Sequence, residues 1–159
     1  MRITIICVGK IKEDFYRKAV SEFEKRLSKY CKLEIIEVQD EKTPDGASEA
    51  TEEQIKEKEA ARILKNIKED AFVYTLEIDG TNPDSVSFAN QINKLAIQGK
   101  SHIQFIIGGS LGLHRSVSKR ADAAISFSKM TFPHQLMRVI LLEQIYRSYR
   151  IIMREPYHK

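Results

Sequence analysis

Cysteine is scarce in this chain of 159 residues, which contains only Cys7 and Cys31. The sequence has no Cys-x-x-Cys pair and no cysteine–histidine cluster with the spacing of zinc ligands. This excludes a structural zinc site that would stabilise the fold. Two cysteines are also too few for the disulfide framework of a small secreted domain. We therefore expect both to be small buried residues in a reducing cytoplasm.

Long apolar runs are missing as well. No stretch approaches the roughly 20 residues that cross a bilayer, so no membrane partner is expected. The apolar start at residues 3–8 is too short for a signal peptide, and Lys10 and Lys12 follow it at once, so it indicates a first strand. Hydrophobic residues make up 42% of the chain and charged residues 30%, which is typical of a globular domain and not of a disordered segment.

Acidic residues are scarce in the last part of the chain only. Residues 100–159 contain 10 lysines and arginines but 3 acidic residues, whereas residues 1–99 contain 16 against 19. The formal net charge of +4 therefore arises in the C-terminal part. A basic segment favours an anionic partner such as nucleic acid, although a mildly basic half is also common in proteins without one.

Apolar periodicity predicts that strands alternate with helices along the whole chain. Strands are expected at 3–8, 33–38, 71–78, 103–107 and 123–127, and helices at 15–30, 49–69, 85–97, 114–120 and 133–152. This order predicts a single domain, residues 1–159, folded as an α/β sandwich with helices on both faces of a mainly parallel sheet. The second strand is the more polar one and is expected near an edge. Ligands bind at the carboxyl ends of such strands, so the loops after Leu76, Ile107 and Phe127 are the candidate site.

Two of these loops have a composition that suits a ligand. Gly108-Gly-Ser-Leu-Gly112 follows a buried strand directly, and glycines there allow positive φ and close approach of a ligand, although a structural turn fits the pattern equally well. The spacing matches neither the dinucleotide-binding nor the P-loop fingerprint, which excludes those two phosphate sites. Residues 126–133 mix polar groups with Phe and Met, and they suit either a purine or an ordinary strand-to-helix connection.

The end of the chain shows two further features. The helix at 133–152 is apolar on more than one face, which predicts a symmetric dimer, with burial inside its own subunit as the alternative. Residues 154–159 combine a guanidinium, a phenol and an imidazole, which can orient a phosphate and move a proton, although most chain ends are frayed and have no function. The remaining histidines, His102, His114 and His134, have no metal-ligand spacing and are expected to be structural or exposed.

Four segments taken together resemble the RlmH family of small SPOUT-class RNA methyltransferases. They are Phe-Ile-Ile-Gly-Gly at 105–109, the block at 128–136, Glu-Gln-Ile-Tyr-Arg at 143–147 and Pro-Tyr-His at 156–158, and the resemblance extends over the whole chain. It implies an α/β sandwich with a deep C-terminal trefoil knot, and a homodimer in which the partner subunit completes each site. It also implies transfer of a methyl group from S-adenosylmethionine to N3 of a pseudouridine, in a hairpin loop of the 23S ribosomal RNA on the ribosome.

The same resemblance implies which residues form the site. The cofactor positions are Leu76, Gly108, Gly109, Phe127, Ser128, Lys129, Met130, Thr131 and Phe132. The catalytic positions lie in the tail: His158, or Tyr157 if its pKa is lowered, would help to remove the acceptor proton, and Arg154 would hold a phosphate or the charge on the base. No metal is implied. The alternatives are a SPOUT methyltransferase of transfer RNA and a ribosome-associated RNA-binding protein without enzymatic activity.

Overall fold

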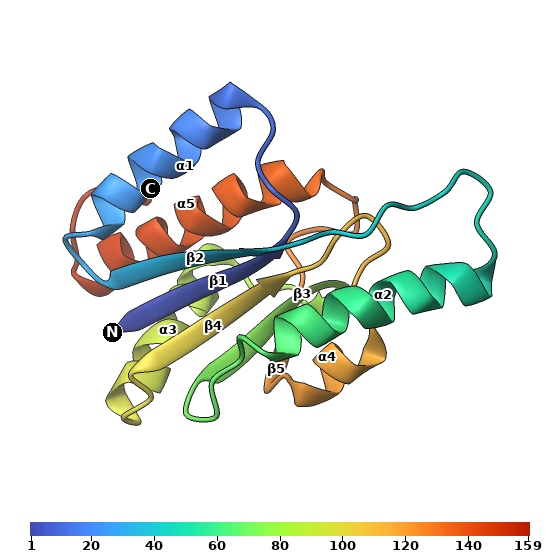
Figure 1. The fold of residues 1–159 in the computed structure, drawn as a ribbon. Coiled ribbons are helices and arrows are strands. Elements are labelled where there is room, and N and C mark those ends of the chain that lie inside the picture. The colour runs from blue at the N-terminus through green and yellow to red at the C-terminus, as the bar shows by residue number, and fades with distance from the viewer.

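A computed structural model describes all residues, 1–159, and contains one five-stranded sheet (Figure 1). The elements in chain order are β1 Arg2–Val8, α1 Asp14–Leu27, β2 Lys32–Val38, α2 Glu49–Leu64, β3 Phe72–Thr81, α3 Ser85–Ile97, β4 His102–Ile107, α4 Arg115–Arg120, β5 Ala123–Ile125 and α5 His134–Ile152. The strands lie in the order β2-β1-β4-β3-β5, and all neighbouring pairs are parallel. The predicted α/β fold with a parallel sheet is therefore confirmed.

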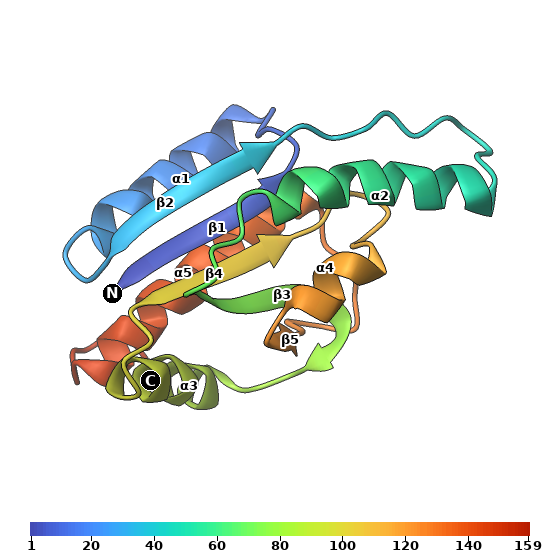
Figure 2. The ribbon, with the colours of Figure 1, turned by 60° about the horizontal axis from the view of Figure 1, so that its bottom comes forward.

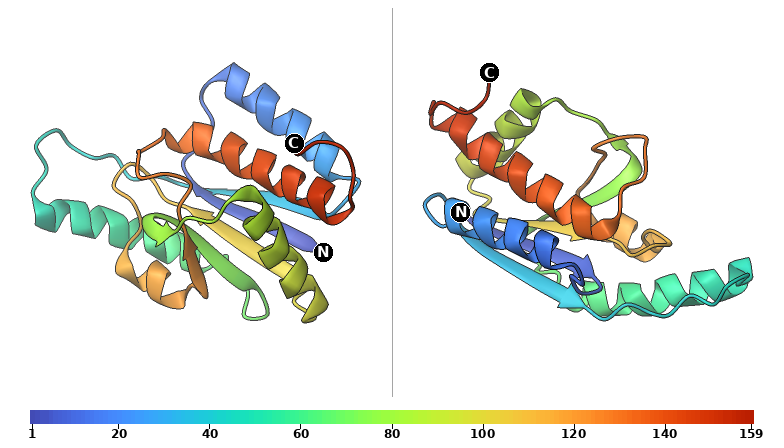
Figure 3. Two further views of the ribbon diagram at one scale, coloured as in Figure 1. Left: turned by 180° about the vertical axis from the view of Figure 1, so that it is seen from behind. Right: turned by 90° about the horizontal axis from the view of Figure 1, so that it is seen from above.

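Helices cover both faces of the sheet, which gives three layers (Figures 2 and 3). On one face, α1, α3 and α5 pack their apolar residues against the sheet in the larger core cluster, which includes Phe88, Phe105 and Leu141. On the other face, α2 and α4 form a smaller cluster around Ile63 and Val117. Burial of this apolar surface is the main favourable term in folding.

The apolar content of each strand matches its place in the sheet. Every residue of β4 is buried, and β4 lies in the middle between β1 and β3. The strand β2 alternates exposed and half-buried residues, and it lies at one edge as its polar composition predicts. This arrangement brings the carboxyl ends of β1, β4, β3 and β5 to one edge of the molecule.

The third strand differs from the prediction, which ended it at Ile78. It continues to Thr81 because a bulge lies between Leu76 and Thr81, and both of these residues pair with Ile125 of β5. The strand β5 ends at Ile125, two residues earlier than predicted, and the N–H of the next residue, Ser126, donates to the Thr81 carbonyl oxygen at 2.7 Å. Gly80 approaches β5 so closely that a Cβ atom there would lie 2.7 Å from the backbone of Ile125.

The helix α5 lies between α1 and α3, and none of its residues is exposed (Figure 3). Its apolar residues are either buried, as Leu141 and Leu142 are, or half-buried, as Val139 and Ile140 are. The dimer and the trefoil knot stay predictions at this stage. None of the helices is both long and apolar enough to cross a membrane.

Candidate functional site

The three loops selected from the sequence surround one cavity of about 630 Å³ at the carboxyl edge of the sheet. This volume suits a drug-sized or cofactor-sized ligand. Eight of the nine residues expected at cofactor positions line the cavity: Leu76, Gly108, Gly109, Phe127, Ser128, Met130, Thr131 and Phe132. The ninth, Lys129, is exposed and does not line it. The sequence therefore predicted which loops meet.

Contacts around Gly108 and Gly109 leave little room for a side chain at either position. A Cβ atom on Gly108 would lie 3.0 Å from the backbone of Gly112 and 3.0 Å from the side chain of Leu113. A Cβ atom on Gly109 would lie 3.2 Å from a carboxylate oxygen of Glu59, a buried residue of α2. Gly112 has φ +82°, a region that favours glycine. The loop is thus a tight turn, and its backbone faces the cavity directly.

Hydrogen bonds fix the loop between β5 and α5, which forms the opposite wall. The Ser126 hydroxyl donates to the Ser128 carbonyl at 3.0 Å, and the Ser128 hydroxyl accepts from the Met130 N–H at 2.9 Å. The Asn82 amide donates to the Ser126 carbonyl at 2.7 Å, which ties this loop to the end of β3. Phe127 packs edge-on against Phe88 of α3. The wall is therefore built from the chain's own contacts.

The cavity has further lining residues that were not among the expected cofactor positions. They are Glu77 and Ile78 of the β3 bulge, Ser110 to Gly112 of the glycine loop, Ser126 after β5, and Pro133, His134 and Met137 at the start of α5, with Ile107 and Ile125 at the strand ends. The position of Glu77 directly after Leu76 was the only available signal for it. Burial lowers the pKa of His134, and the positive charge of the nearby Arg138 lowers it further. The imidazole is therefore neutral at neutral pH.

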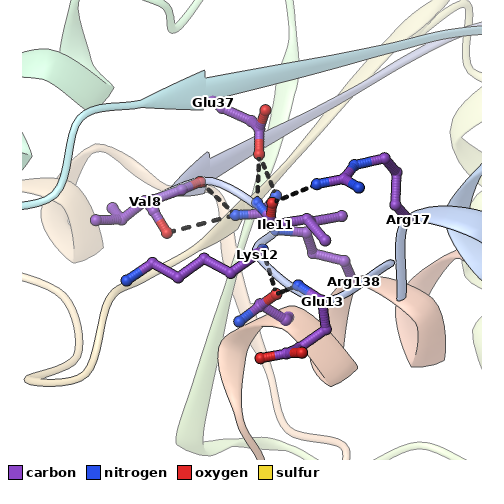
Figure 4. A network of polar contacts seen from close by, with 9 residues as sticks. Val8, Ile11, Lys12, Glu13, Arg17, Glu37 and Arg138 are labelled. Atoms are coloured by element: carbon purple, nitrogen blue, oxygen red, sulfur yellow. Dashed lines mark hydrogen bonds and ion pairs between the residues drawn. The ribbon is translucent and has the colours of Figure 1, made fainter. Parts of the chain in front are cut away.

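A buried arginine holds the start of α5 against the sheet (Figure 4). Arg138 is 1% exposed, and its guanidinium donates to a carboxylate oxygen of Glu37 at 2.6 Å and to the Gly9 carbonyl. The same Glu37 oxygen accepts from the Ile11 N–H at 3.1 Å. One turn earlier, the Gln135 side chain accepts from the Lys12 N–H at 2.8 Å. This network fixes the helix that carries His134 and Met137 into the cavity wall.

The tail residues Arg154, Tyr157 and His158 do not line the cavity of their own chain. The Tyr157 hydroxyl donates to Glu143 at 3.0 Å, and His158 lies 3.3 Å from Arg147, so the tail folds back on the second half of α5. Arg147 lies about 20 Å along the helix from His134, at a rise of about 1.5 Å per residue. One chain alone therefore does not bring the tail and the cavity together.

The acid–base state of the tail bears on the role expected for Tyr157. Burial and the hydrogen bond to Glu143 raise the pKa of Tyr157, so the lowered pKa under which Tyr157 would accept a proton does not occur in this chain. A raised pKa disfavours Tyr157 as the group that removes the acceptor proton. The Tyr157 phenol is better suited to donating a hydrogen bond.

The cysteines take no part in the site. Both are free and buried, as the sequence predicted. Burial raises the pKa of the Cys7 thiol to about 12 and that of Cys31 to about 11, so neither forms a reactive thiolate near neutral pH. The structure contains no group of three or more metal-ligating side chains.

Comparisons with known proteins agree with this architecture. Residues 1–158 match the family whose description is "Predicted SPOUT methyltransferase". Two relatives, each 61% identical over 159 residues and covering 100% of both chains, are the "Ribosomal RNA large subunit methyltransferase H" of Bifidobacterium adolescentis and that of Clostridium tetani. "The structure of a probable methylase family protein from Haemophilus influenzae Rd KW20" aligns with 99% of this chain and 70% of that chain, with a TM-score of 0.56 and 11% identity. This last similarity concerns the fold alone.

Proposed function

The chain belongs to the SPOUT methyltransferase family, and we propose that it transfers a methyl group from S-adenosylmethionine to large-subunit ribosomal RNA. Within that RNA, the proposed acceptor is N3 of a pseudouridine in a hairpin loop. The observation that carries the proposal is the single cavity in which three separate loops place eight expected donor-binding residues. The names of the relatives support the RNA class.

The cavity fits the methyl donor in size and in chemistry. S-adenosylmethionine supplies a methyl group on a positively charged sulfur, so the protein needs no metal to make it reactive. Leu76, Ile107 and Met137 provide apolar walls for the nucleoside, and the backbone of residues 127–132 offers N–H and carbonyl groups to the edge of an adenine. On the other side, residues 108 and 109 of the glycine loop line the cavity without side chains, so a ligand could approach their backbone closely.

The RNA would approach over basic residues beside the cavity. Arg115 and Lys119 on α4 follow the glycine loop, and Lys129 belongs to the loop before α5; all three are exposed. None of them forms an ion pair within the chain. Phosphate contacts of this kind supply affinity and make it depend on salt.

Two copies of the chain are needed for a complete site in this proposal. The tail carries the groups suited to proton removal and phosphate binding, yet it lies far from its own cavity. Met130 at the cavity is 74% exposed and Ile78 is 50% exposed, which leaves apolar surface at the mouth for a second subunit to cover. We therefore infer a homodimer in which the tail of one subunit completes the cavity of the other.

The tail residues would then have separate roles. The acceptor nitrogen carries a proton that must leave, and His158 would accept it during methyl transfer. Arg154 would hold a phosphate or the negative charge that develops on the base, and Tyr157 would donate a hydrogen bond. In the free chain, Tyr157 contacts Glu143 and His158 contacts Arg147, which gives the tail a defined position along α5.

Methylation assays test the proposed reaction. Purified protein should methylate ribosomes from cells in which this protein has been deleted, and mass spectrometry of the RNA should place the methyl group on a pseudouridine. Ribosomes whose target uridine has not been isomerised should be poor substrates. Methylation of bulk transfer RNA instead of ribosomes would favour the first alternative. Ribosome binding without donor binding in calorimetry would favour the non-enzymatic one.

Substitution of His158 should give a large catalytic loss. We expect His158→Ala to lower the methylation rate about 10²- to 10⁴-fold, the usual contribution of a general base. Lys159→Ala, at the next position, should be close to wild type. Mixing His158→Ala subunits with subunits whose cavity is blocked by Gly108→Val should restore activity, because one heterodimer then contains one intact site. No recovery on mixing would show that each tail serves its own subunit.

Arg154 allows activity and stability to be separated. It has φ +55° at the end of α5, where the Glu155 N–H bonds to the Arg150 carbonyl, and glycine is the residue best suited to that backbone. We expect Arg154→Gly to leave the free energy of unfolding unchanged or to raise it by about 1 kcal/mol. Methylation should fall in the same variant. Full activity in this variant would remove Arg154 from the site.

A further inference from the structure

The β3 bulge places a carboxylate at the cavity. Leu76 and Thr81 both pair with Ile125, so residues 77–80 leave the ladder and project from the strand. The hydrogen bonds from Ser126 to Thr81 and from Asn82 to Ser126 fix the base of this bulge to the loop that follows β5. Bulges beside active sites commonly redirect a side chain. Here the first residue of the bulge is Glu77, which is half-buried and lines the cavity.

Two hydroxyl groups hold the Glu77 carboxylate in one orientation. The Thr75 hydroxyl donates to one oxygen at 2.6 Å, and the Ser118 hydroxyl of α4 donates to the other at 2.7 Å. Thr75 also lies 3.5 Å from the Ala123 carbonyl, but the shorter contact to a charged acceptor is the stronger one. Because Thr75 is fully buried on the strand, this side chain is held in place before any ligand binds.

The carboxylate has unused hydrogen-bonding capacity. An ionised carboxylate can accept about four hydrogen bonds, and the structure supplies two. No lysine, arginine or histidine forms an ion pair with Glu77. The remaining acceptor positions of this half-buried carboxylate are therefore open to a ligand that donates hydrogen bonds. A ligand with paired hydroxyl groups would satisfy it.

We propose that Glu77 binds the ribose of the methyl donor by accepting hydrogen bonds from its 2′- and 3′-hydroxyls. This assignment rests on the proposed function, because it requires a nucleoside in the cavity. The pairing of Leu76 with Ile125 places Glu77 beside the start of the loop 126–132, whose backbone is proposed to hold the adenine. The ribose is the polar group closest to the adenine, whereas the amino acid end of the donor lies farther away.

Calorimetry with S-adenosylhomocysteine and its 2′-deoxy and 3′-deoxy analogues tests the assignment. Glu77→Gln should weaken S-adenosylhomocysteine by about 10- to 100-fold, the usual range for hydrogen bonds to a charged group. In the wild-type protein, at least one deoxy analogue should bind more weakly than S-adenosylhomocysteine, by a similar factor. In Glu77→Gln the same analogue should bind about as well as S-adenosylhomocysteine, because the two changes remove one interaction.

Asp79→Asn is the matched control, since Asp79 is exposed on the same bulge and does not line the cavity. It should bind all three ligands like wild type. Equal affinity of the wild-type protein for all three ligands would overturn the assignment. That measurement uses only wild-type protein, so it does not depend on whether a variant folds. A loss in Glu77→Gln that is the same for all three ligands would also overturn it, because the carboxylate would then contact another part of the donor. If the wild-type protein bound none of the three ligands, the result would instead contradict the proposed function.

Discussion

Arg138→Met is expected to lower the free energy of unfolding by about 3 kcal/mol, the lower end of the range for breaking a buried ion pair. Methionine can fill the space of the arginine stem, but it supplies no donor to Glu37 or to the Gly9 carbonyl. Glu37 is 36% exposed, so water can partly replace the guanidinium, which keeps the loss from being larger. Urea unfolding followed by circular dichroism measures the change.

The same substitution should also weaken donor binding, because it releases the start of α5. Arg17→Ala is the control: Arg17 is 59% exposed and pairs only with Asp14 and a loop carbonyl, so its loss should cost well under 1 kcal/mol. Combining Arg138→Met with Glu37→Gln gives a double-mutant cycle for the pair. If Arg138→Met were as stable as wild type, apolar packing alone would be sufficient to hold α5.

Gly80→Ala is expected to be comparably harmful. The added methyl group would lie 2.7 Å from the backbone nitrogen and carbon of Ile125, and a backbone cannot rotate away as a side chain can. Overpacking of this kind costs about 3 kcal/mol. Because Ile125 leads into the cavity wall, the affinity for S-adenosylhomocysteine should fall as well. Thermal unfolding and calorimetry on one preparation measure both effects.

Gly99→Ala separates steric overlap from backbone strain. Gly99 has φ +80° at the end of α3, but nothing lies within 4 Å of its Cβ position. Its substitution should cost about 1 kcal/mol through strain and leave ligand binding unchanged. If Gly80→Ala behaved like Gly99→Ala, the bulge would be free to move away from β5. The proposed role of Glu77 would then lose its rigid base.

Much of the fold could be predicted because the apolar content of each strand indicates its position in the sheet. The sequence of β4 is apolar almost throughout and belongs in the centre, whereas β2 alternates charged and apolar residues and belongs at the edge. The bulge in β3 could not be predicted in this way. The bulge brings Gly80 close to a strand that lies more than forty residues later, and local periodicity contains no information about that contact.

The site was predictable to the extent that it follows from topology. Parallel strands bring their carboxyl ends together, and this was sufficient to select the loops after Leu76, Ile107 and Phe127. The sequence could not show that Arg138 is buried, because an arginine on a helix is usually exposed. It also could not show that Tyr157 and His158 contact Glu143 and Arg147, since a tail has no periodicity from which its path could be inferred.

The helix α5 works as a spacer of fixed length. It carries part of the cavity wall at its first turn and the tail at its last, and its 19 residues set the separation at about 28 Å. Inserting one residue would lengthen it by about 1.5 Å and rotate the tail by about 100° relative to the cavity. The loop at residues 39–48 extends away from the body of the protein (Figure 1). Changes of length are therefore more tolerable at the tip of that loop than within α5, where each one would shift the tail relative to the cavity.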